Sequence, residues 1–512
     1  MNRARATPSL PGLGLLLLSL ATPVVADTVH EVRRGETLWG IARAHGVSVE
    51  AVREANELDD ADRLLAGRRL RIPTTTSAAA TGEARRPRDP VGSSPARVVA
   101  AAAGAPAPAA SPARSSAGEG DAPLAEVVLE DLSGRALDRW FERLGRVERG
   151  TPGAVVRVAH FGDSHSATTS FTSAIHGTLA ARFGDAGPGF LQPGRPWRSY
   201  DPAGVDVGAD DAWTFDRVHG RDETVLDDGR FGLGGWSARS AEPDAVLWVE
   251  TEPRAVAGAF EVQYLAQPGG GSAELLLDGE VVGRIDTAAD TPAVGRHRVQ
   301  TEEDRHRFEV RLRGDGEVRL LGLSAERSGP GVRWDVLATN GARADWLLEW
   351  DAGLFAEALA QREPDLVVLL YGTNEAADDD LDLDRYAGRL AEALERVRNA
   401  APEASCLVVG PPDLSHRERR AWRGTPERLP ELIERQRARA AEAGCAFLDL
   451  FAAMGGPGAM DRWVAADPPL GARDRVHLTA RGYRVLGEAL AGALLRAYDA
   501  STGAASPAAA AE

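Results

Sequence analysis

The chain has 512 residues, of which 43% are hydrophobic, so it is long enough to bury a sizeable core and too long to form one ordinary domain. Its 76 Asp and Glu and 59 Lys and Arg give a formal net charge of -17. A negative net charge disfavours sequence-independent binding to the phosphate backbone of nucleic acids. We therefore expect several domains and no nucleic-acid partner.

Residues 1–26 have the three-part layout of a secretory signal peptide. Arg3 and Arg5 form a positive start, the apolar run from Leu13 to Leu20 is too short to span a membrane, and small residues precede a cleavage point after Ala26. No later stretch reaches about 18 apolar residues without a charge. We expect an exported protein, periplasmic or extracellular, with no integral membrane segment after signal removal.

Residues 27–73 form a small unit with the expected order strand, helix, helix, strand. The first strand is predicted over His30–Arg33, the helices over Thr37–His45 and after Ser48, and the closing strand over Leu70–Pro73. With Gly35-Glu36-Thr37-Leu38-Trp39 before the first helix and Asn56 after the second, the unit resembles a LysM module. The resemblance implies binding of N-acetylglucosamine-containing glycans such as peptidoglycan. A degenerate module that serves only as a spacer is the alternative.

Residues 74–122 contain mainly Ala, Pro, Ser, Gly and Arg, with no aromatic residue and no Leu or Ile. Such a composition cannot offset the entropy of ordering, so we expect a disordered linker. A second disordered stretch is expected at the tail, residues 500–512.

Two buried-strand runs in the following region each end in polar residues. Val155–Phe161 leads into Gly162-Asp163-Ser164-His165, and Asp365–Tyr371 leads into Gly372-Thr373-Asn374-Glu375. The carboxyl edge of a parallel sheet is where α/β enzymes place their chemistry. This pattern favours Ser164 as a nucleophile and Asn374 as a donor to an oxyanion.

Two further features complete a candidate site. Asp474 and His477 stand three residues apart before a helix predicted over Thr479–Tyr498, so the carboxylate can fix the tautomer of the ring. A glycine turn at Gly341 precedes a helix predicted over Asp345–Gln361, and its backbone amide can point at the same place.

Together these four blocks resemble the SGNH branch of the GDSL hydrolases, with Ser164, Gly341, Asn374 and His477 at the name-giving positions in the expected order. Two departures are His165, where the eponymous motif has Leu, and the long separation between Ser164 and Gly341. Both are found in the peptidoglycan O-acetylesterase group. The resemblance implies an α/β fold with a flavodoxin-like, doubly wound parallel sheet over 123–196 and 329–499.

The resemblance also implies how the site works. Ser164 is the nucleophile, His477 the base and Asp474 its partner, and the oxyanion hole combines the backbone amides of Ser164 and Gly341 with the Asn374 side chain. No metal and no cofactor is needed.

Between the two halves of this domain, residues 197–328 show short alternating strands separated by Gly, Pro and Asp turns. Examples are Ala245–Glu250, Ala259–Leu265 and Arg307–Leu312, a pattern typical of an antiparallel β-sandwich. The insertion is expected to hold glycan on an open face, or to act as a lid or structural prop. Trp236, Trp248 and Trp334 are candidates for either a sugar platform or the core.

The function expected from these features is removal of O-acetyl groups from the muramic acid of peptidoglycan by a monomeric serine esterase. An O-acetyltransferase or an esterase on another acetylated cell-envelope glycan is the alternative. A non-catalytic peptidoglycan-binding protein is the alternative from another class, and the intact set of site residues argues against it.

Several other residues need an interpretation. Asp163 is expected to stabilise the turn as an acceptor, and Asp413 and His416 are expected to lie outside the catalytic set, because Asp474 and His477 have better spacing. The cysteines, Cys406 and Cys445, begin two strands that are neighbours in a flavodoxin-like order. A disulfide between them and two buried thiols remain equally open.

Overall fold

The computed structural model describes residues 28–32, 41, 45, 52, 55–56, 68–72, 124–219, 226, 228–252, 255–418 and 421–503. The expected signal peptide, most of both LysM helices, the linker and residues 504–512 lie outside the described residues. Contacts divide the chain into two units, 1–112 and 113–512, which we describe separately. Within the described ranges, no helix is both long enough and apolar enough to cross a membrane.

The first unit contains a two-stranded antiparallel sheet of β1 (Thr28–Glu31) and β2 (Arg69–Ile72). Asn56 ties this sheet to the preceding chain, because its Nδ2 donates to the carbonyl of Arg71 and its Oδ1 accepts from the amide of Arg71, both at 2.7 Å. The first strand begins two residues earlier than the sequence predicts. The described residues that are buried in the first unit are Val32, Ile41, Val52, Leu70 and Ile72.

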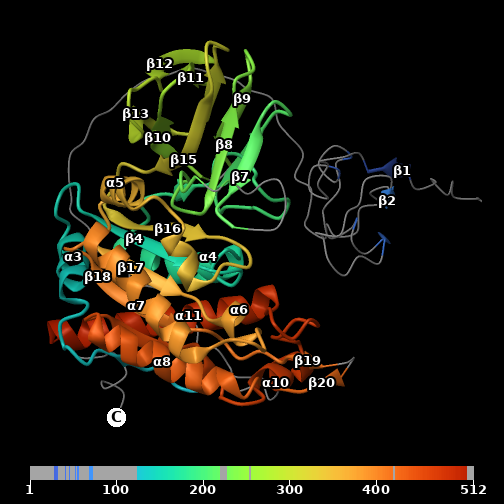
Figure 1. The fold of residues 1–512 in the computed structure, drawn as a ribbon, viewed down its shortest axis with the longest axis vertical. Helices are drawn as coiled ribbons and strands as arrows, with labels where there is room; N and C mark the ends of the chain where they lie inside the picture. Colours follow the sequence, from blue (N-terminus) through green and yellow to red (C-terminus); the bar gives the residue numbers. More distant parts are fainter. Residues whose placement is uncertain are drawn as a thin grey trace, which may run out of the picture. The chain divides into compact units, whose positions relative to one another are not determined.

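The second unit is built around a six-stranded sheet of order β16-β4-β17-β18-β21-β3 (Figure 1). The parallel strands of this sheet are β16, β4, β17, β18 and β21, and β3 pairs antiparallel with β21 at the edge. Since β4 is the first of the parallel strands in the chain and lies between β16 and β17, the order is flavodoxin-like, as predicted. The strands are β3 (Leu129–Glu130), β4 (Val155–Gly162), β16 (Gly331–Ala338), β17 (Leu366–Leu370), β18 (Ser405–Gly410) and β21 (Ala446–Asp449).

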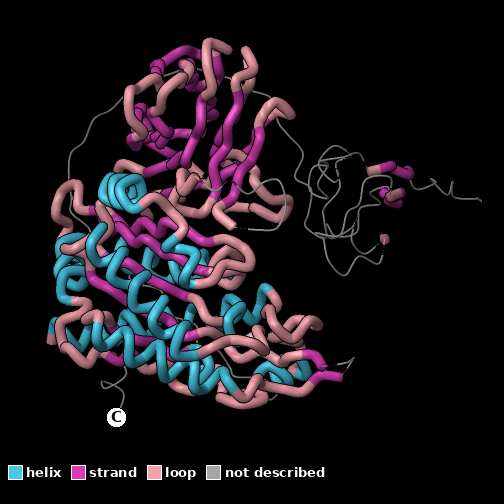
Figure 2. The backbone as a smooth tube through the Cα atoms, in the orientation of Figure 1, coloured by secondary structure: helices cyan, strands magenta, loops and turns pink. Residues whose placement is uncertain are grey.

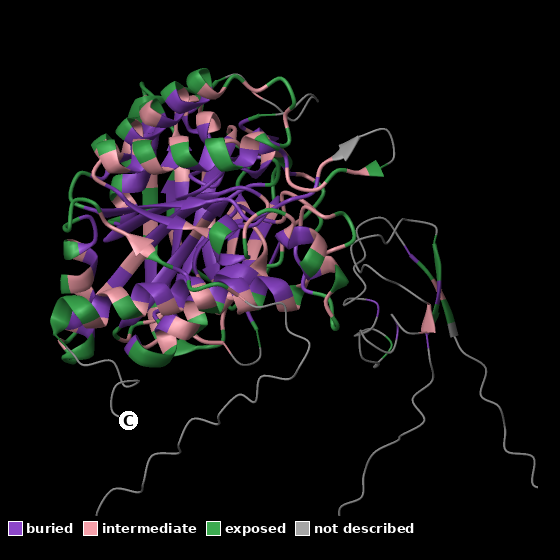
Figure 3. Cartoon of the chain, turned by 90° about the horizontal axis from the view of Figure 1, so that it is seen from below, coloured by how far each residue is buried: buried purple, intermediate pink, exposed green. Residues whose placement is uncertain are grey.

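Helices cover both faces of this sheet, and their apolar sides meet the buried strands (Figures 2 and 3). One face carries α3 (Asp138–Glu148), α4 (Thr169–Phe183) and α11 (Ala480–Thr502), and the other carries α5 (Ala352–Arg362), α7 (Leu383–Ala400) and α8 (Arg428–Glu442). The shorter elements are the 3₁₀ helix η2 (Ala344–Leu348), α6 (Thr373–Ala376), α9 (Leu450–Ala453), α10 (Ala459–Ala465) and the hairpin β19 (Arg417–Glu418) with β20 (Ala421–Trp422).

The insertion consists of two antiparallel sheets packed over a common core, which confirms the predicted sandwich. One sheet has the order β13-β10-β15-β8-β7 and the other β12-β11-β14-β9-β6. The strands are β6 (Val205–Ala209), β7 (Thr214–Arg217), β8 (Trp236–Ser240), β9 (Val246–Thr251), β10 (Ala257–Ala266), β11 (Ser272–Leu277), β12 (Glu280–Asp286), β13 (Ala293–Asp304), β14 (Arg307–Leu312) and β15 (Val318–Glu326).

The structure corrects the expected start of the insertion at residue 197. Strand β5 (Gly189–Leu191) pairs antiparallel with β15, so the sheet of the insertion already takes up residues before 197. Three residues between glycine and proline turns are too short to show an alternating pattern. The expected tail is also corrected at its start, because α11 continues through Thr502.

The helix predicted over Asp345–Gln361 is interrupted in the structure. It divides into η2 and α5, and Asp351 caps α5 by accepting a hydrogen bond from the amide of Leu354 at 2.9 Å. The interruption is stabilised by Arg396, whose Nη1 donates to the carbonyls of Leu347 and Trp350 at 2.9 and 2.7 Å. The carbonyl groups of Leu347 and Trp350 at this break thus accept hydrogen bonds from a side chain in place of the backbone amides of a continuing helix.

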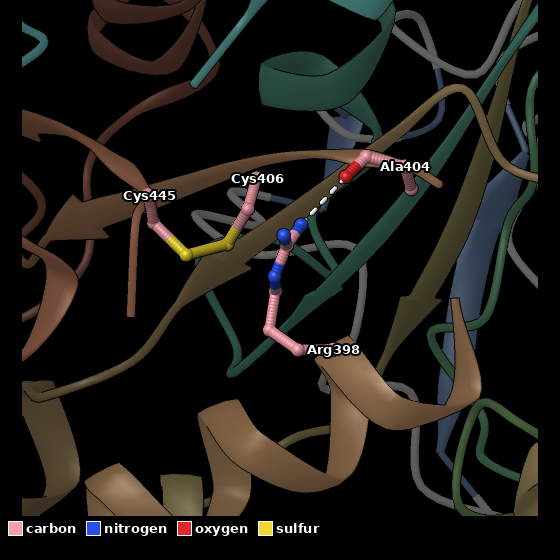
Figure 4. Close-up of a disulfide and its surroundings, with 4 residues drawn as sticks. All are labelled: Arg398, Ala404, Cys406 and Cys445. Carbon is pink, nitrogen blue, oxygen red and sulfur yellow. Dashed lines mark hydrogen bonds between the residues drawn. A yellow bond between two sulfur atoms is a disulfide. The ribbon is translucent and has the colours of Figure 1, made fainter. Parts of the chain in front are cut away.

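At the amino-terminal end of the sheet, Cys406 and Cys445 form a disulfide with a Cα–Cα separation of 4.6 Å (Figure 4). Strands β18 and β21 are parallel neighbours with Leu407 opposite Ala446, so the two cysteines stand side by side. Next to the bridge, Arg398 of α7 donates to the carbonyl of Ala404 at 2.7 Å. Of the two open alternatives, the structure therefore has the disulfide.

Candidate active site

Three neighbouring strands of the central sheet end at the same height. Gly162, the last residue of β4, stands opposite Ala338 of β16 and Leu370 of β17. The segments that follow these strands carry Ser164, Gly341 and Asn374. Strand order and register therefore bring three of the predicted site segments to one edge of the sheet.

The turn after β4 requires glycine at its start. A Cβ at Gly162 would lie 2.1 Å from Ser166 Oγ and 2.9 Å from the carbonyl oxygen of Leu370, so a larger residue would push the turn away from the sheet. The next residue, Asp163, is fully buried, and its Oδ1 accepts from the amide of His165 at 2.9 Å. Asp163 thus takes the turn-stabilising contacts expected of it.

The structure brings Ser164, His477 and Asp474 together in a continuous hydrogen-bonded row. Ser164 Oγ lies 2.9 Å from His477 Nε2, and His477 Nδ1 lies 2.8 Å from Asp474 Oδ2. The other carboxylate oxygen, Oδ1, accepts from the amides of Val476 and His477 at 3.1 and 2.9 Å. Since α11 begins just after this loop, the sheet edge and the helix entry together fix the three side chains.

The electrostatics of this row favour a base at His477. The hydrogen bond that His477 donates to Asp474 raises the pKa of His477, against the opposing effect of burial. Burial also acts on Asp474, but the hydrogen bonds from His477 and from the two backbone amides outweigh it and lower the pKa of that carboxyl. The acid is therefore ionised and stabilises a positive charge on the imidazole.

Two more titratable groups lie beneath the row. His165 is buried, its Nδ1 lies 3.0 Å from the hydroxyl oxygen of Tyr483, and its ring centroid is 5.5 Å from that of His477. Burial lowers the pKa of His165 to about 3, so this ring stays neutral beside a neighbour that becomes charged. Burial raises the pKa of Asp163 to about 6.

On the other side of Ser164, the Gly341 turn and the Asn374 turn contact each other. Asn374 Nδ2 donates to the carbonyl of Ala342 at 2.9 Å, which uses one of the two N–H groups of that amide. Gly341 is exposed and has a φ of 78°, a left-handed conformation that favours glycine. The insertion supports this turn, because Trp236 Nε1 donates to Thr339 Oγ1 at 2.7 Å.

Other candidates from the sequence lie in structural roles. Asp413 is buried and accepts from Thr425 Oγ1 and from the amide of Met460, both at 2.8 Å. His416 Nδ1 lies 3.0 Å from the carbonyl oxygen of Gly424. Trp236 and Trp334 are buried, whereas Trp248 is half-buried beneath the guanidinium of Arg307.

Trp334 lies in β16 of the central sheet and not in the insertion. Its Nε1 donates to His160 Nδ1 at 3.0 Å, which places it in the core beside the central sheet. Within the described part of the chain, His, Cys, Asp and Glu form no group of three or more that could hold a metal ion.

Sequence reasoning missed Glu375 and His219. Glu375 lies directly after Asn374 and is buried, and its two carboxylate oxygens bind backbone amides on both sides of the site. His219, which belongs to the insertion, stacks on Trp346 with ring centroids 4.4 Å apart and binds Glu349 at 3.0 Å. The sequence shows a Glu next to the oxyanion-donor candidate but not its burial or its distant partner, and it gives no signal of the stacking between His219 and Trp346.

Two family models match the chain. Residues 308–485 match the GDSL-like Lipase/Acylhydrolase family, and residues 30–73 match the LysM domain. The first match contains Gly341, Asn374, Asp474 and His477, while Ser164 lies before it, on the other side of the insertion.

Known structures and proteins resemble parts of the chain. A solved structure of a peptidoglycan O-acetylesterase superposes with a TM-score of 0.59 and 24% identity, covering 71% of this chain and 96% of that one, which shows a shared fold. The probable endopeptidase p60 of Listeria monocytogenes is 34% identical over 80 residues, 15% of this chain and 16% of that protein. A GDSL lipase of Mycobacterium tuberculosis is 28% identical over 174 residues, 31% of this chain and 68% of that protein.

The matched region spans only 14–16% of the length of the Listeria relatives, so these comparisons reach single domains and not whole proteins. The LysM match overlaps the paired strands β1 and β2, and the GDSL-like match contains β16, β17, β18 and β21 of the flavodoxin-like sheet. The chain therefore carries a LysM domain and a hydrolase domain of the GDSL-like lipase/acylhydrolase family, the SGNH hydrolases.

Proposed function

We propose that this protein is a serine esterase that removes O-acetyl groups from the muramic acid of peptidoglycan. The observation that carries the proposal is the row formed by Ser164, His477 and Asp474, with contacts of 2.9 and 2.8 Å, at the sheet edge where the Gly341 and Asn374 turns meet. A nucleophile, a base and an orienting acid within hydrogen-bonding distance are the arrangement that acyl transfer needs.

The first half of the reaction forms an acetyl-enzyme. Ser164 Oγ attacks the acetyl carbonyl carbon while its proton passes to Nε2 of His477, and ionised Asp474 stabilises the resulting imidazolium. The negative charge that develops on the carbonyl oxygen is held by the amides of Ser164 and Gly341 and by Nδ2 of Asn374. The tetrahedral intermediate then breaks its bond to the sugar oxygen, which leaves with the proton from His477.

The second half regenerates the serine. A water molecule gives a proton to His477 Nε2 and attacks the acetyl carbon, and acetate leaves as the proton returns to Ser164 Oγ. The neutral state of buried His165 suits this cycle, because a second positive charge 5.5 Å from His477 would oppose the imidazolium.

The choice of peptidoglycan rests on the combination of domains. The LysM match at residues 30–73 supports a glycan of the cell wall as the partner, and the fold shared with a peptidoglycan O-acetylesterase supports an acetyl ester on that glycan as the substrate. We place the protein outside the cytoplasm, in contact with the cell wall, in keeping with the signal peptide expected from the sequence.

The test is product analysis with O-acetylated peptidoglycan. The full protein should release free acetate, and Ser164→Ala should release none above the blank. Transfer of the acetyl group to another glycan hydroxyl, with no free acetate, would replace the esterase by an acetyltransferase. Activity on other acetylated polysaccharides but not on peptidoglycan would change the substrate.

A truncated protein that starts near Pro123 separates binding from chemistry. It should hydrolyse a small soluble acetyl ester as fast as the full protein does, because residues 113–512 form a unit of their own. It should also sediment poorly with insoluble peptidoglycan, since the LysM module is absent. Equal sedimentation of both proteins would move the glycan-binding role to the inserted β-sandwich.

A further inference from the structure

Behind the Asn374 turn, one buried carboxylate connects two segments of the site. Glu375 is 2% exposed and lies in α6. Its Oε1 accepts from the amide of Ala344 at 2.9 Å, and its Oε2 accepts from the amide of Gly372 at 3.1 Å. The first amide follows β16 and the second follows β17, so this single side chain joins the turns that come after the two strands flanking β4.

The same two segments share further hydrogen bonds. Asn374 Nδ2 donates to the carbonyl of Ala342 at 2.9 Å, and Arg343 Nη1 donates to Asp378 Oδ2 at 2.8 Å. The Arg343–Asp378 pair is about one-third exposed on both sides. Glu375 differs from it because both its oxygens are bound to backbone amides in a buried place, where a hydrogen bond to an ionised group is strong.

The position of these two segments matters for the proposed reaction. Gly341 and Asn374 are the donors that are meant to hold the oxyanion, and they come from different strands. An oxyanion hole works only when its donors are fixed in place before the charge develops, and a displacement of about 1 Å can cost about 10²-fold in rate. A residue that sets the distance between the two turns therefore affects turnover without touching the substrate.

We propose that Glu375 is a positioning residue for ester hydrolysis, and that its ionised carboxylate holds the Gly341–Ala344 loop against the Asn374 turn. This proposal rests on the proposed function only in that the site hydrolyses acetyl esters. It does not depend on which glycan carries the acetyl group.

The charges around Glu375 determine how it responds to pH. Burial raises the pKa of Glu375 to about 7, Asp163 on the nucleophile turn adds to this effect, and Arg343 on the loop opposes it. Burial raises the pKa of Tyr371, after β17, and of Tyr386, in α7, well above that of free tyrosine, and the charge of Glu375 adds to the effect on both phenols.

When Glu375 is protonated, one of its carboxylate oxygens becomes an O–H donor. This donor faces a backbone N–H group, which is itself a donor and cannot accept a hydrogen bond. The hydrogen bond from the Ala344 amide stabilises the ionised form and lowers the pKa of Glu375 against the larger effect of burial, so protonation weakens this bond. The loop should therefore loosen as the pH falls through about 7. Protonation of His477 acts in the same direction, because it removes the base. The acid side of the profile of log kcat against pH should then include one ionisation from His477 and a further one from Glu375.

The experiment compares wild type, Glu375→Gln and the control Glu363→Gln on a small soluble acetyl ester. Glu363 is a suitable control because its side chain is 66% exposed at the opposite end of the sheet. We expect Glu375→Gln to lower kcat about 10- to 100-fold with KM changed less than about 3-fold. We also expect its acid limb to lose one ionisation with a midpoint near 7, while Glu363→Gln matches wild type.

A folded Glu375→Gln protein with wild-type kcat would overturn the proposal, and so would a lower kcat with an unchanged acid limb. If Glu375→Gln does not fold, Glu375→Asp decides. A lower kcat that keeps the full acid limb supports the proposal, because the carboxylate is present but shorter, and an unchanged kcat overturns it. Failure of the proposed esterase function would give a different result, because wild type would then release no more acetate than Ser164→Ala.

Discussion

The two ends of the central sheet are built in different ways. At the carboxyl end, the reactive row stands on turns and is partly open to solvent, with 53% of the Asp474 side chain and 39% of the His477 side chain exposed. At the amino end, Cys406 and Cys445 are joined covalently, and Asp365, 3% exposed, binds Arg143 at 3.0 Å and the amide of Arg157 at 3.0 Å.

This difference separates chemistry from stability. Groups at the carboxyl end are held by a few hydrogen bonds each and face the place where a substrate has to enter, so changing one of them should alter turnover and leave the fold intact. Groups at the amino end are buried and joined to two or more elements, so changing them should alter the free energy of unfolding and leave turnover intact. Four substitutions test this separation.

Ser164→Ala should have the largest effect on turnover. Acetate release from a chromogenic acetyl ester should fall to background, because the next hydroxyl on the turn, Ser166 Oγ, bonds to His160 at 3.0 Å and not to His477. The free energy of unfolding in urea should change by no more than about 0.5 kcal/mol. Activity above a few per cent of wild type would show that another group is the nucleophile.

Asp474→Asn should lower turnover by up to about 10⁴-fold, because the amide cannot stabilise an imidazolium and can favour the wrong tautomer of His477. The hydrogen bond that His477 donates to Asp474 raises the pKa of His477, so wild type should lose activity as the pH falls through a value above that of a free histidine. In the variant this acid limb should move to lower pH. A profile of kcat/KM against pH measures the shift, and an unmoved limb would contradict the assignment of His477 as base.

Asn374→Ala should lower kcat about 10²- to 10³-fold, since one oxyanion donor is lost while β17 beneath it is unchanged. The matched control is Asn399→Ala on the exposed side of α7, which should keep wild-type kcat. Steady-state kinetics on a soluble acetyl ester measures both variants. A turnover number equal to that of the control would show that the Asn374 amide does not reach the oxyanion.

The buried apolar strands and the turns that end them were predictable from the sequence. Val155–Phe161 and the strand of Leu366–Leu370 are short apolar runs bounded by glycine, and each sits where the pattern placed it. The flavodoxin-like order then brings their ends to one edge. For that reason the turns of Ser164 and Asn374 lie at one edge. Asp474 and His477 reach the same edge from the loop before α11, where His477 Nε2 lies 2.9 Å from Ser164 Oγ.

The missed features depend on contacts between distant segments. Strand β16 contains Arg333 and Asp335, which interrupt an apolar run, and these charges are buried only because they pair with residues from elsewhere in the fold. Arg333 binds Glu326 of β15 at 2.6 Å, and Arg362 of α5 binds Asp335 at 2.8 Å. Glu375 is similar, since its partner amide at Ala344 lies 31 positions away. A local pattern holds no information on such pairs.

The disulfide at the amino end should have the smallest effect on turnover and a large one on stability. Cys406 and Cys445 are 39 positions apart, and closing a loop of this length removes enough entropy from the unfolded chain to contribute about 3–4 kcal/mol.

Replacing both cysteines by Ala should therefore lower the free energy of unfolding in urea by about this amount. It should leave kcat on a soluble ester within about twofold of wild type, because the bridge lies at the end of the sheet remote from Ser164. Thiol titration of the denatured, unreduced wild type provides the control and should find no free thiol, since the chain contains 2 Cys. Two free thiols, or a large loss of turnover in the stable double variant, would break the separation between the two ends of the sheet.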